Sequence, residues 1–343
     1  MRDVLLPLER GQRFLDRSER DAGSSTPQDP HSSPVVVVDV HDFLGRTLPE
    51  REAILSPWLL TQSLNMIHSW RGVGKTHAAL GIAFAVASGG TFLTWSAPKA
   101  RRVLYIDGEM PATALQERLA AINVSADVEP APGMLHLITP DLQHGPMPDL
   151  ATSDGQAAIN AVISDSELIV LDNLSCLARS GGRENDAESW LPVAEWALQM
   201  RSGGRSVLFI HHSAKGGQQR GTSKREDLLD TVLRLKEPSD YRHGEGARFE
   251  VHYEKARNLH GEVTRPIEAI LTTDEAGHTR WTFRRVEETT FDRVVALAND
   301  GLSRSEIALE LECNRSTVFR HWRKAETDGL IRKVDVPKKR EAR

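Results

Sequence analysis

The chain has 343 residues, of which 39% are hydrophobic and 27% are charged, a composition typical of a globular protein with about two domains. Its two cysteines, Cys176 and Cys313, do not have the spacing of a metal site, so we expect no disulfide framework and no zinc ribbon. No apolar run reaches the ~20 residues of a membrane span, so we expect no membrane partner. Both observations fit a cytoplasmic protein. The net charge of -5 is uneven, because residues 312–343 carry an excess of basic residues over an acidic remainder, and this weakly favours a polyanion partner.

The first 40 residues are rich in Arg, Asp, Ser and Pro, which predicts a flexible N-terminal arm over residues 1–40. Charged residues soon interrupt the apolar residues at its start, so it does not have the pattern of a signal peptide. The run Val35–Val38 is a candidate edge strand.

From about residue 55 to residue 215 the chain alternates short apolar runs with helical patterns, which predicts a mainly parallel sheet within one α/β domain over residues 41–286. After residue 220 strands follow one another with little helix between them, which predicts an antiparallel extension of the same sheet. The expected strands are Leu64–His68, Val103–Asp107, Leu135–Thr139, Leu168–Asp172, Ser206–His211, Thr231–Lys236, Ala247–Lys255, Ile267–Thr272 and Thr279–Arg285. The expected helices are Thr76–Ser88, Pro111–Ile122, Gly155–Val162 and Asp186–Met200.

A glycine-rich turn, Ser69-Trp70-Arg71-Gly72-Val73-Gly74-Lys75-Thr76, follows the first of these strands and opens the first helix. Backbone N–H groups of such a turn surround phosphate oxygens, and the start of the helix adds positive potential. Lys75 would reach the β- and γ-phosphates of ATP, and the Thr76 hydroxyl would hold Mg²⁺. Ser69 stands where this pattern usually has its first glycine. The expected nucleotide-binding residues are Arg71, Gly72, Val73, Gly74, Lys75, Thr76 and His77.

An ATPase also needs a carboxylate near the metal and a base that polarises the attacking water. The strand Leu168–Asp172 supplies Asp172, which we expect to orient Mg²⁺ through its water shell. Many ATPases have a Glu directly after this Asp, but here the residue is Asn173. The end of strand Val103–Asp107 offers Glu109 as the general base, with a helix-start carboxylate as the alternative interpretation.

Two adjacent histidines, His211 and His212, end the strand next to the one that supplies Asp172. Neighbouring residues of a strand face opposite sides, so we expect only one of them to point toward the γ-phosphate and sense it. No third ligand has suitable spacing, so metal binding by this pair is not expected.

These motifs together resemble the RecA-like P-loop ATPase core of the plasmid RepA type, related to the hexameric DnaB and RadA motors. The resemblance covers roughly residues 50–285 and implies a hexameric, replicative helicase-like ATPase that uses ATP and Mg²⁺. It also implies that Glu109 is the catalytic base and that His212 is the phosphate sensor. It rests on Arg-Gly-Val-Gly-Lys-Thr at 71–76, Tyr-Ile-Asp-Gly-Glu-Met at 105–110, Leu-Ile-Val-Leu-Asp-Asn at 168–173, His-His-Ser-Ala-Lys at 211–215 and Arg-Gly-Thr-Ser at 220–223.

The resemblance further implies a catalytic arginine supplied by a neighbouring subunit. In DnaB-like members, a late strand ends in a Lys-x-Arg-x-Gly element that reaches the neighbour's nucleotide. Lys255-Ala256-Arg257-Asn258 is the matching stretch here, although the glycine appears only at Gly261. Arg257 is therefore the expected residue, with Arg220 and Arg234 as rivals, while Arg71 lies at a position that faces away in the family's loop.

Residues 287–334 form a separate predicted unit, followed by a basic tail, residues 335–343. A capping box at Ser303–Glu306 and three apolar patterns resemble a winged helix-turn-helix, which implies DNA binding. We expect Val318, Phe319 and Trp322 to pack on the first two helices. A role in protein contact remains the alternative. The predicted elements are helices at Phe291–Leu297, Ile307–Leu311 and Ser316–Ala325 and a wing strand at Gly329–Lys333, and the expected DNA contacts are Arg315, Ser316, Thr317, Arg320 and Arg323.

Three functions share the predicted ATP site: an oligomeric motor on DNA, a DNA-binding regulator switched by ATP, and a recombination or signalling ATPase. The DNA would be single-stranded in a ring channel, duplex at the C-terminal unit, or both. Loops Arg179–Asn185 and Lys215–Lys224 are suited to backbone contact, or are ordinary solvated loops. The sequence leaves open unwinding, step direction, ring size and DNA preference, and an unwinding assay on forked duplex discriminates best among the three.

Overall fold

We analysed a computed structural model, which describes residues 35–180, 187–213, 226–238, 241–242, 244–257, 259–275, 278–286, 290–311 and 313–331. The chain divides into two compact units, residues 1–50 and residues 51–343. No helix in these ranges combines the length and hydropathy that a membrane crossing requires.

The described part of the first unit contains one short helix, α2 (Val40–Gly45), whose N-cap Asp39 accepts a hydrogen bond from His41 N at 2.8 Å. The edge strand predicted at Val35–Val38 is wrong, since none of these residues belongs to a strand. β-branched composition is a weak signal by itself, because a strand also needs a partner edge to pair with.

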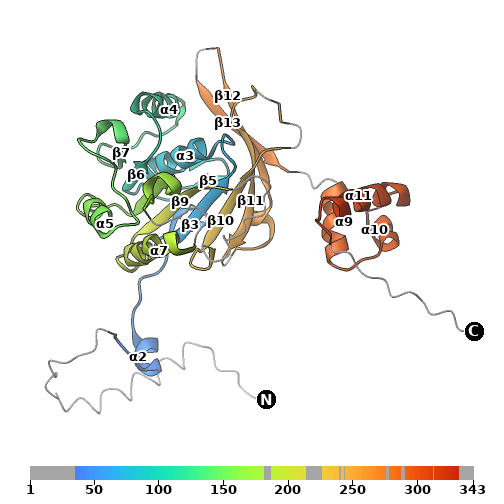
Figure 1. Cartoon of the computed structure of the whole chain (residues 1–343), viewed down its shortest axis with the longest axis horizontal. Coiled ribbons are helices and arrows are strands. Elements are labelled where there is room, and N and C mark those ends of the chain that lie inside the picture. Colours follow the sequence, from blue (N-terminus) through green and yellow to red (C-terminus); the bar gives the residue numbers. More distant parts are fainter. Residues whose placement is uncertain are drawn as a thin grey trace, which may run out of the picture. The chain divides into compact units, whose positions relative to one another are not determined.

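The second unit is built on a nine-stranded sheet with the order β13-β12-β11-β10-β3-β9-β8-β6-β7 (Figure 1). Six neighbouring strands, from β10 to β7, are parallel, and β11, β12 and β13 extend the sheet in antiparallel fashion. The predicted α/β fold with a mainly parallel sheet and an antiparallel extension is confirmed. The strands are β3 (Leu64–Ser69), β6 (Val103–Asp107), β7 (Leu135–Ile138), β8 (Leu168–Asp172), β9 (Ser206–His212), β10 (Thr231–Lys236), β11 (Arg248–Ala256), β12 (Ile267–Thr273) and β13 (Thr279–Arg285).

Helices cover both faces of the sheet, and alternate strand residues belong to two separate cores. Ile67 of β3 packs in a core with α3 (Lys75–Ser88) and α4 (Ala112–Ser125). Its neighbour Met66 packs in the opposite core, formed with α5 (Ser153–Asn160), α6 (Leu174–Leu177) and α7 (Ala187–Ser202). Burial on both faces explains why β3, β6, β8 and β9 are apolar almost throughout.

Two small hairpins were not predicted from the sequence. They pair β1 (Ala53–Leu55) with β2 (Leu59–Leu60), and β4 (Thr91–Phe92) with β5 (Trp95–Ser96). Phe92 covers α3 so closely that a Cβ at Gly81 would lie 2.2 Å from its ring. Two short 3₁₀ turns, η1 (Pro140–Leu142) and η2 (Gly261–Thr264), complete the connections.

The C-terminal helices α9 (Thr290–Asn299), α10 (Arg304–Glu310) and α11 (Arg315–Thr327) share a core of their own. The capping box is present, because Ser303 and Glu306 exchange the two expected hydrogen bonds. In the predicted wing, residues 329–331 form a turn and a bend rather than a strand, and residues 332–333 lie outside the described ranges.

Phe319 was predicted to pack onto the first two helices of this unit, and this prediction is wrong because its side chain is 51% exposed. Val318, Trp322 and Ala325 follow the i, i+4, i+7 spacing of one helix face and pack in the core. Phe319 is about 100° further around the helix than Val318, so it falls outside that face.

Candidate functional site

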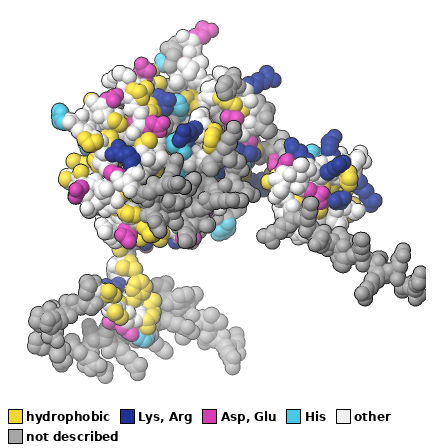
Figure 2. Space-filling model, in the orientation of Figure 1, with side chains coloured by type: hydrophobic (Ala, Val, Ile, Leu, Met, Phe, Trp, Pro, Cys, Tyr) yellow, Lys and Arg dark blue, Asp and Glu magenta, His cyan; other side chains and the backbone are white. Residues whose placement is uncertain are grey.

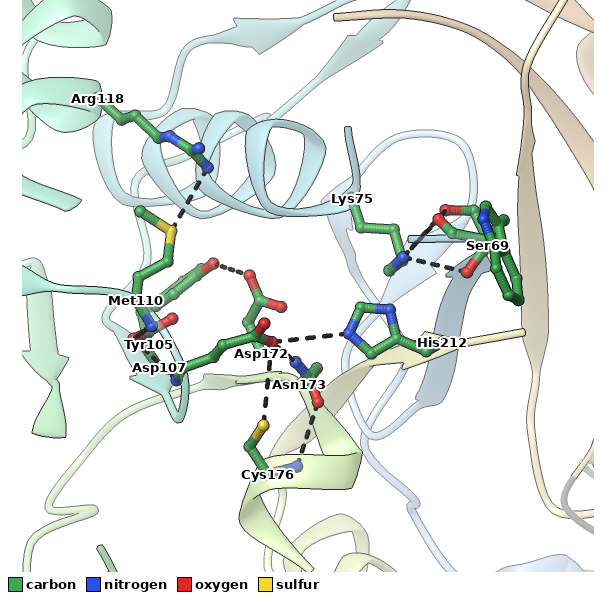
Figure 3. A network of polar contacts seen from close by, with 12 residues as sticks. Ser69, Lys75, Tyr105, Asp107, Met110, Arg118, Asp172, Asn173, Cys176 and His212 are labelled. Atoms are coloured by element: carbon green, nitrogen blue, oxygen red, sulfur yellow. Dashed lines mark hydrogen bonds and ion pairs between the residues drawn. The ribbon is translucent and has the colours of Figure 1, made fainter. Parts of the chain in front are cut away.

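The candidate site lies where the parallel strands β3, β6, β8 and β9 end side by side (Figure 3). Strand register aligns their last residues, because Ser69 pairs with His212 and Asp107 pairs with Asp172. Ligands of open parallel sheets bind at this edge, where loops from different strands meet. The sequence segments 69–76, 105–110, 168–173 and 211–213 are thereby brought together.

The loop after β3 has the backbone needed to surround phosphate. Gly72 and Gly74 adopt φ values of 83° and 119°, which a residue with a side chain rarely adopts. Lys75 begins α3 and its Nζ donates to Ser69 O at 3.0 Å, Trp70 O at 2.9 Å and Ser69 Oγ at 3.2 Å. Ser69, at the position of the missing first glycine, therefore helps to orient the lysine. Burial lowers the pKa of Lys75 to about 8.

Asp172 lies beside Thr76 and is almost fully buried. It accepts a hydrogen bond from the Tyr105 hydroxyl at 2.7 Å, and the Thr76 side chain is close enough to lower its pKa. Burial raises the pKa of Asp172, while these two side chains and the charge of Lys75 oppose that rise. A carboxylate and a nearby hydroxyl are oxygen ligands that suit Mg²⁺, so the residues present fit the metal that the sequence predicts.

Glu109 follows β6 in a tight turn that Asp107 holds in place. The Asp107 carboxylate accepts hydrogen bonds from Glu109 N at 3.3 Å and Met110 N at 2.8 Å. The Glu109 side chain is 59% exposed, and its Oε2 accepts a hydrogen bond from Asn173 Nδ2 and lies 3.6 Å from His212 Nε2. Its carboxylate is thus positioned by a neighbouring strand yet open to solvent.

His212 is the member of the histidine pair that lies beside Glu109, whereas the side chain of His211 is buried. Burial, followed by the charge of Lys75, lowers the pKa of His212, which favours the neutral form of its ring. Its Nδ1 is buried and has no hydrogen-bond partner among the residues that the structure describes. The ring of His212 points toward Lys75 (Figure 3), and its other nitrogen, Nε2, is the one that lies near Glu109.

Arg71 and His77 flank the phosphate loop on its two ends. Burial is the main cause of the lowered pKa of Lys75 and of His212, and the charge of Arg71 adds to it in both. Burial and the charge of Arg118 lower the pKa of His77 to about 4. His77 also lines a cavity of about 760 Å³ between α3, α4 and the β12–β13 hairpin.

Arg257 is not brought into this site within the chain. It directly follows β11, whose last residue Ala256 pairs with Thr231, which in turn pairs with Asn65 near the beginning of β3. Arg257 therefore lies near the beginning of β3, whereas Lys75 follows the end of β3. At this position the Nη2 atom of Arg257 donates a hydrogen bond to Asp227 O at 2.8 Å. Of the two rivals, Arg234 lies 3.4 Å from Glu254 on the sheet surface, and Arg220 falls outside the described residues.

The expected DNA contacts are all on α11, and most of them are exposed. Arg315, Ser316, Arg320 and Arg323 are exposed, while Thr317 is half-buried. Of the two candidate loops, residues 215–224 lie outside the described ranges, as do residues 181–185 of the other. Arg179 is described, and its side chain donates to Met147 O.

Three residues that position the site were missed from the sequence: Tyr105, Asp107 and Asn173. Each contacts a candidate residue from the neighbouring strand or turn. The signal was available in part, because Tyr105 and Asp107 alternate along β6 toward the same face. Asn173 stands out in the sequence only as the absence of a Glu.

A profile of the AAA domain family matches residues 28–218, more than half of the chain. Among solved structures, the flagellar accessory protein FlaH from Methanocaldococcus jannaschii is similar with 10% identity and a TM-score of 0.43, over 65% of this chain and 90% of that one. The KaiC-like protein PH0186 from Pyrococcus horikoshii OT3 is similar with 12% identity and a TM-score of 0.44, over 67% and 93%. At these identities and scores neither structure bears on function. The family match does: the chain belongs to the AAA domain family and carries an AAA-type ATPase domain.

Proposed function

We propose that the protein is a Mg²⁺-dependent, DNA-binding ATPase that works as an oligomer, in the manner of RepA-type replicative helicases. The observation that carries the ATPase part is the meeting of Lys75, Thr76, Asp172 and Glu109 at one edge of the sheet. In this proposal Lys75 and the N–H groups of residues 71–77 hold the phosphates, which the positive φ values of Gly72 and Gly74 support.

Each side chain then has a defined task in hydrolysis. Thr76 and Asp172 would hold the Mg²⁺, which supplies charge neutralisation on the phosphates when bound. Glu109 accepts the proton of the attacking water, and its exposure and its hydrogen bond from Asn173 support that task. His212 offers a neutral ring to the γ-phosphate and so reports its presence to the segment that follows β9.

The position of Arg257 supports a site completed by a second subunit. Arg257 lies at the end of the strands opposite its own Lys75, so in this proposal it serves the nucleotide of another copy. An arginine supplied in trans is worth roughly 10³–10⁵ in rate in related phosphoryl transfers. Mixing Glu109→Gln protein with Arg257→Ala protein tests this, because an active mixture of two inactive variants requires a shared site. Full activity of Arg257→Ala protein by itself would rule the arginine out and leave Arg234 and Arg220 to be tested.

The DNA-binding part of the proposal rests on α11, whose exposed arginines lie on a helix with its own supporting core. Replacing Arg320 and Arg323 with Ala should weaken duplex binding and reduce its salt slope by roughly one unit for each phosphate that is no longer neutralised. This three-helix unit also favours a second candidate, a DNA-bound regulator that uses ATP as an assembly switch. Unwinding of forked duplex separates the two, since only the motor unwinds it.

The ATPase proposal is tested by phosphate release from ATP with and without Mg²⁺ and DNA. We expect hydrolysis that requires Mg²⁺ and rises with DNA, and its loss in Lys75→Ala. Lys99→Ala is the matched control, because Lys99 is an exposed lysine paired with Glu52 away from the site. Hydrolysis that survives Lys75→Ala would contradict the proposed site.

A further inference from the structure

Phe319 occupies an unusual position for a large apolar residue. Its side chain is 51% exposed, although the core of the three-helix unit is complete without it. On α11 it lies one turn after Arg315 and one turn before Arg323, so it shares their face of the helix. Exposure of an apolar ring within a row of cations points to a partner that offers both negative charge and an apolar group.

The ring of Phe319 is held from one side by another arginine. The guanidinium of Arg304 lies 5.3 Å from the Phe319 centroid and 5.0 Å from the Trp322 centroid. Arg304 also lies 3.7 Å from Glu326, an ion pair that favours this position of the guanidinium. Cation–π contact with two rings restrains Phe319, so its exposed part is preorganised rather than free to rotate away.

The surface next to Phe319 is hollowed and cationic. A shallow cavity of about 450 Å³ is lined by the ring together with Arg320, Arg323, Lys324, Thr327 and Asp328. Three cations face one carboxylate there, and Figure 2 shows Lys and Arg side chains gathered on the visible face of this unit. Such a cavity suits a phosphate group of a nucleic-acid backbone, which would place the adjoining ring at the edge of a groove.

We propose that Phe319 contacts the C5-methyl group of thymine in the major groove and gives this protein a preference for thymine. The inference rests on the proposed DNA binding by α11 and deepens it. Thymine is the base that presents an apolar group in the major groove, and Phe is one of the side chains that suit it. Phe319 is the fifth residue of α11, within the N-terminal part of the helix that reads bases in helix-turn-helix proteins.

The size of the effect follows from one methyl group. Burying a CH₂-sized group changes affinity by about fourfold, so each contacted thymine should favour binding by about that factor over uracil. The two bases form the same hydrogen bonds and carry the same backbone charge. The arginine contacts should therefore not distinguish them.

The experiment compares two short alternating duplexes, one of adenine with thymine and one of adenine with uracil in a deoxyribose backbone. Full-length, nucleotide-free protein is titrated into each labelled duplex and the anisotropy is recorded at several salt concentrations. We expect the wild type to bind the thymine duplex about fourfold more tightly or better. Phe319→Ala should lose this preference with an unchanged salt slope, and Phe319→Leu should recover part of it.

Arg320→Ala is the matched control, because Arg320 lines the same cavity as Phe319 but carries a charged group instead of an apolar ring. It should weaken binding to both duplexes by the same factor and keep the thymine preference. Binding of both duplexes with equal affinity by the wild type would overturn the role of Phe319 while leaving DNA binding intact. Binding of neither duplex would overturn the role of α11 in DNA binding, and the thymine contact with it.

Discussion

Asp107 should make the protein less stable at neutral pH than an uncharged residue would. The side chain is 1% exposed, and burial raises its pKa from 3.8 to about 6. This difference of about two units corresponds to about 3 kcal/mol of unfolding free energy. The carboxylate accepts its two backbone hydrogen bonds through one oxygen, which an asparagine side chain retains.

The direction of the pH dependence follows from the raised pKa. Below pH 3.8 the carboxyl is protonated in both the folded and the unfolded state, and the folded state loses no stability. Between pH 3.8 and about 6 the folded state keeps a proton that the unfolded state has released, so stability falls as pH rises. Above about pH 6 both states are ionised and the loss is complete.

Thermal unfolding of Asp107→Asn and wild type, followed by circular dichroism without nucleotide or metal, measures this effect. We expect the variant to unfold roughly 5–10 °C higher at pH 7.5, with a difference that shrinks toward pH 4. Asp141→Asn is the control, because the exposed Asp141 also accepts a backbone hydrogen bond, from Ala112. A Tm difference that is absent, or independent of pH, would refute the reasoning.

Two further predictions concern packing and the metal. Gly81→Ala should lower the Tm, because the added Cβ would lie 2.2 Å from the Phe92 ring. Such overpacking of a core destabilises the folded state by about 1–3 kcal/mol. Gly145→Ala is the control and should leave the Tm unchanged, because there is open space around Gly145. Tyr105→Phe removes the 2.7 Å hydrogen bond to Asp172. The Mg²⁺ concentration that gives half-maximal ATP hydrolysis should therefore rise by about 10-fold or more. An unchanged Mg²⁺ dependence would contradict this prediction.

The centre of the sheet could be predicted from the sequence because β3, β6, β8 and β9 are buried on both faces. The bounds of all nine strands of the large sheet lie within a residue or two of the predicted bounds. The hairpin β4–β5 could not be predicted in the same way, because each of its strands has two residues and no period can be read. The hairpin is stabilised by contact between the rings of Phe92 and Trp95. The Phe92 ring also contacts the ring of Trp281, a residue distant in sequence.

Candidate residues of the site could be predicted from the sequence where a motif coincides with the end of a strand. Parallel strands finish at one edge, so Asp172, Glu109 and His212 could be expected near Lys75 before any geometry was known. The hydrogen bonds from Tyr105 to Asp172 and from Asn173 to Glu109 were not accessible, because they depend on the register of β6 against β8.

Phe319 shows the limit of pattern reading within a helix. Val318 and Phe319 are adjacent apolar residues, and the sequence pattern predicts both in the core. Only one can follow the face that continues to Trp322 and Ala325, and the packed structure selects Val318. The residue left outside is the one on which the proposed thymine contact depends.

In the proposed mechanism, Glu109 activates water for ATP hydrolysis at the loop that contains Lys75. Single-turnover hydrolysis of ATP by Glu109→Gln, with nucleotide binding measured separately, tests it most directly, and Glu129→Gln, at an exposed position outside the site, is the control. We predict that Glu109→Gln binds ATP as the wild type does and hydrolyses it on the order of 10²-fold more slowly or worse. Hydrolysis by Glu109→Gln at the wild-type rate would contradict the account.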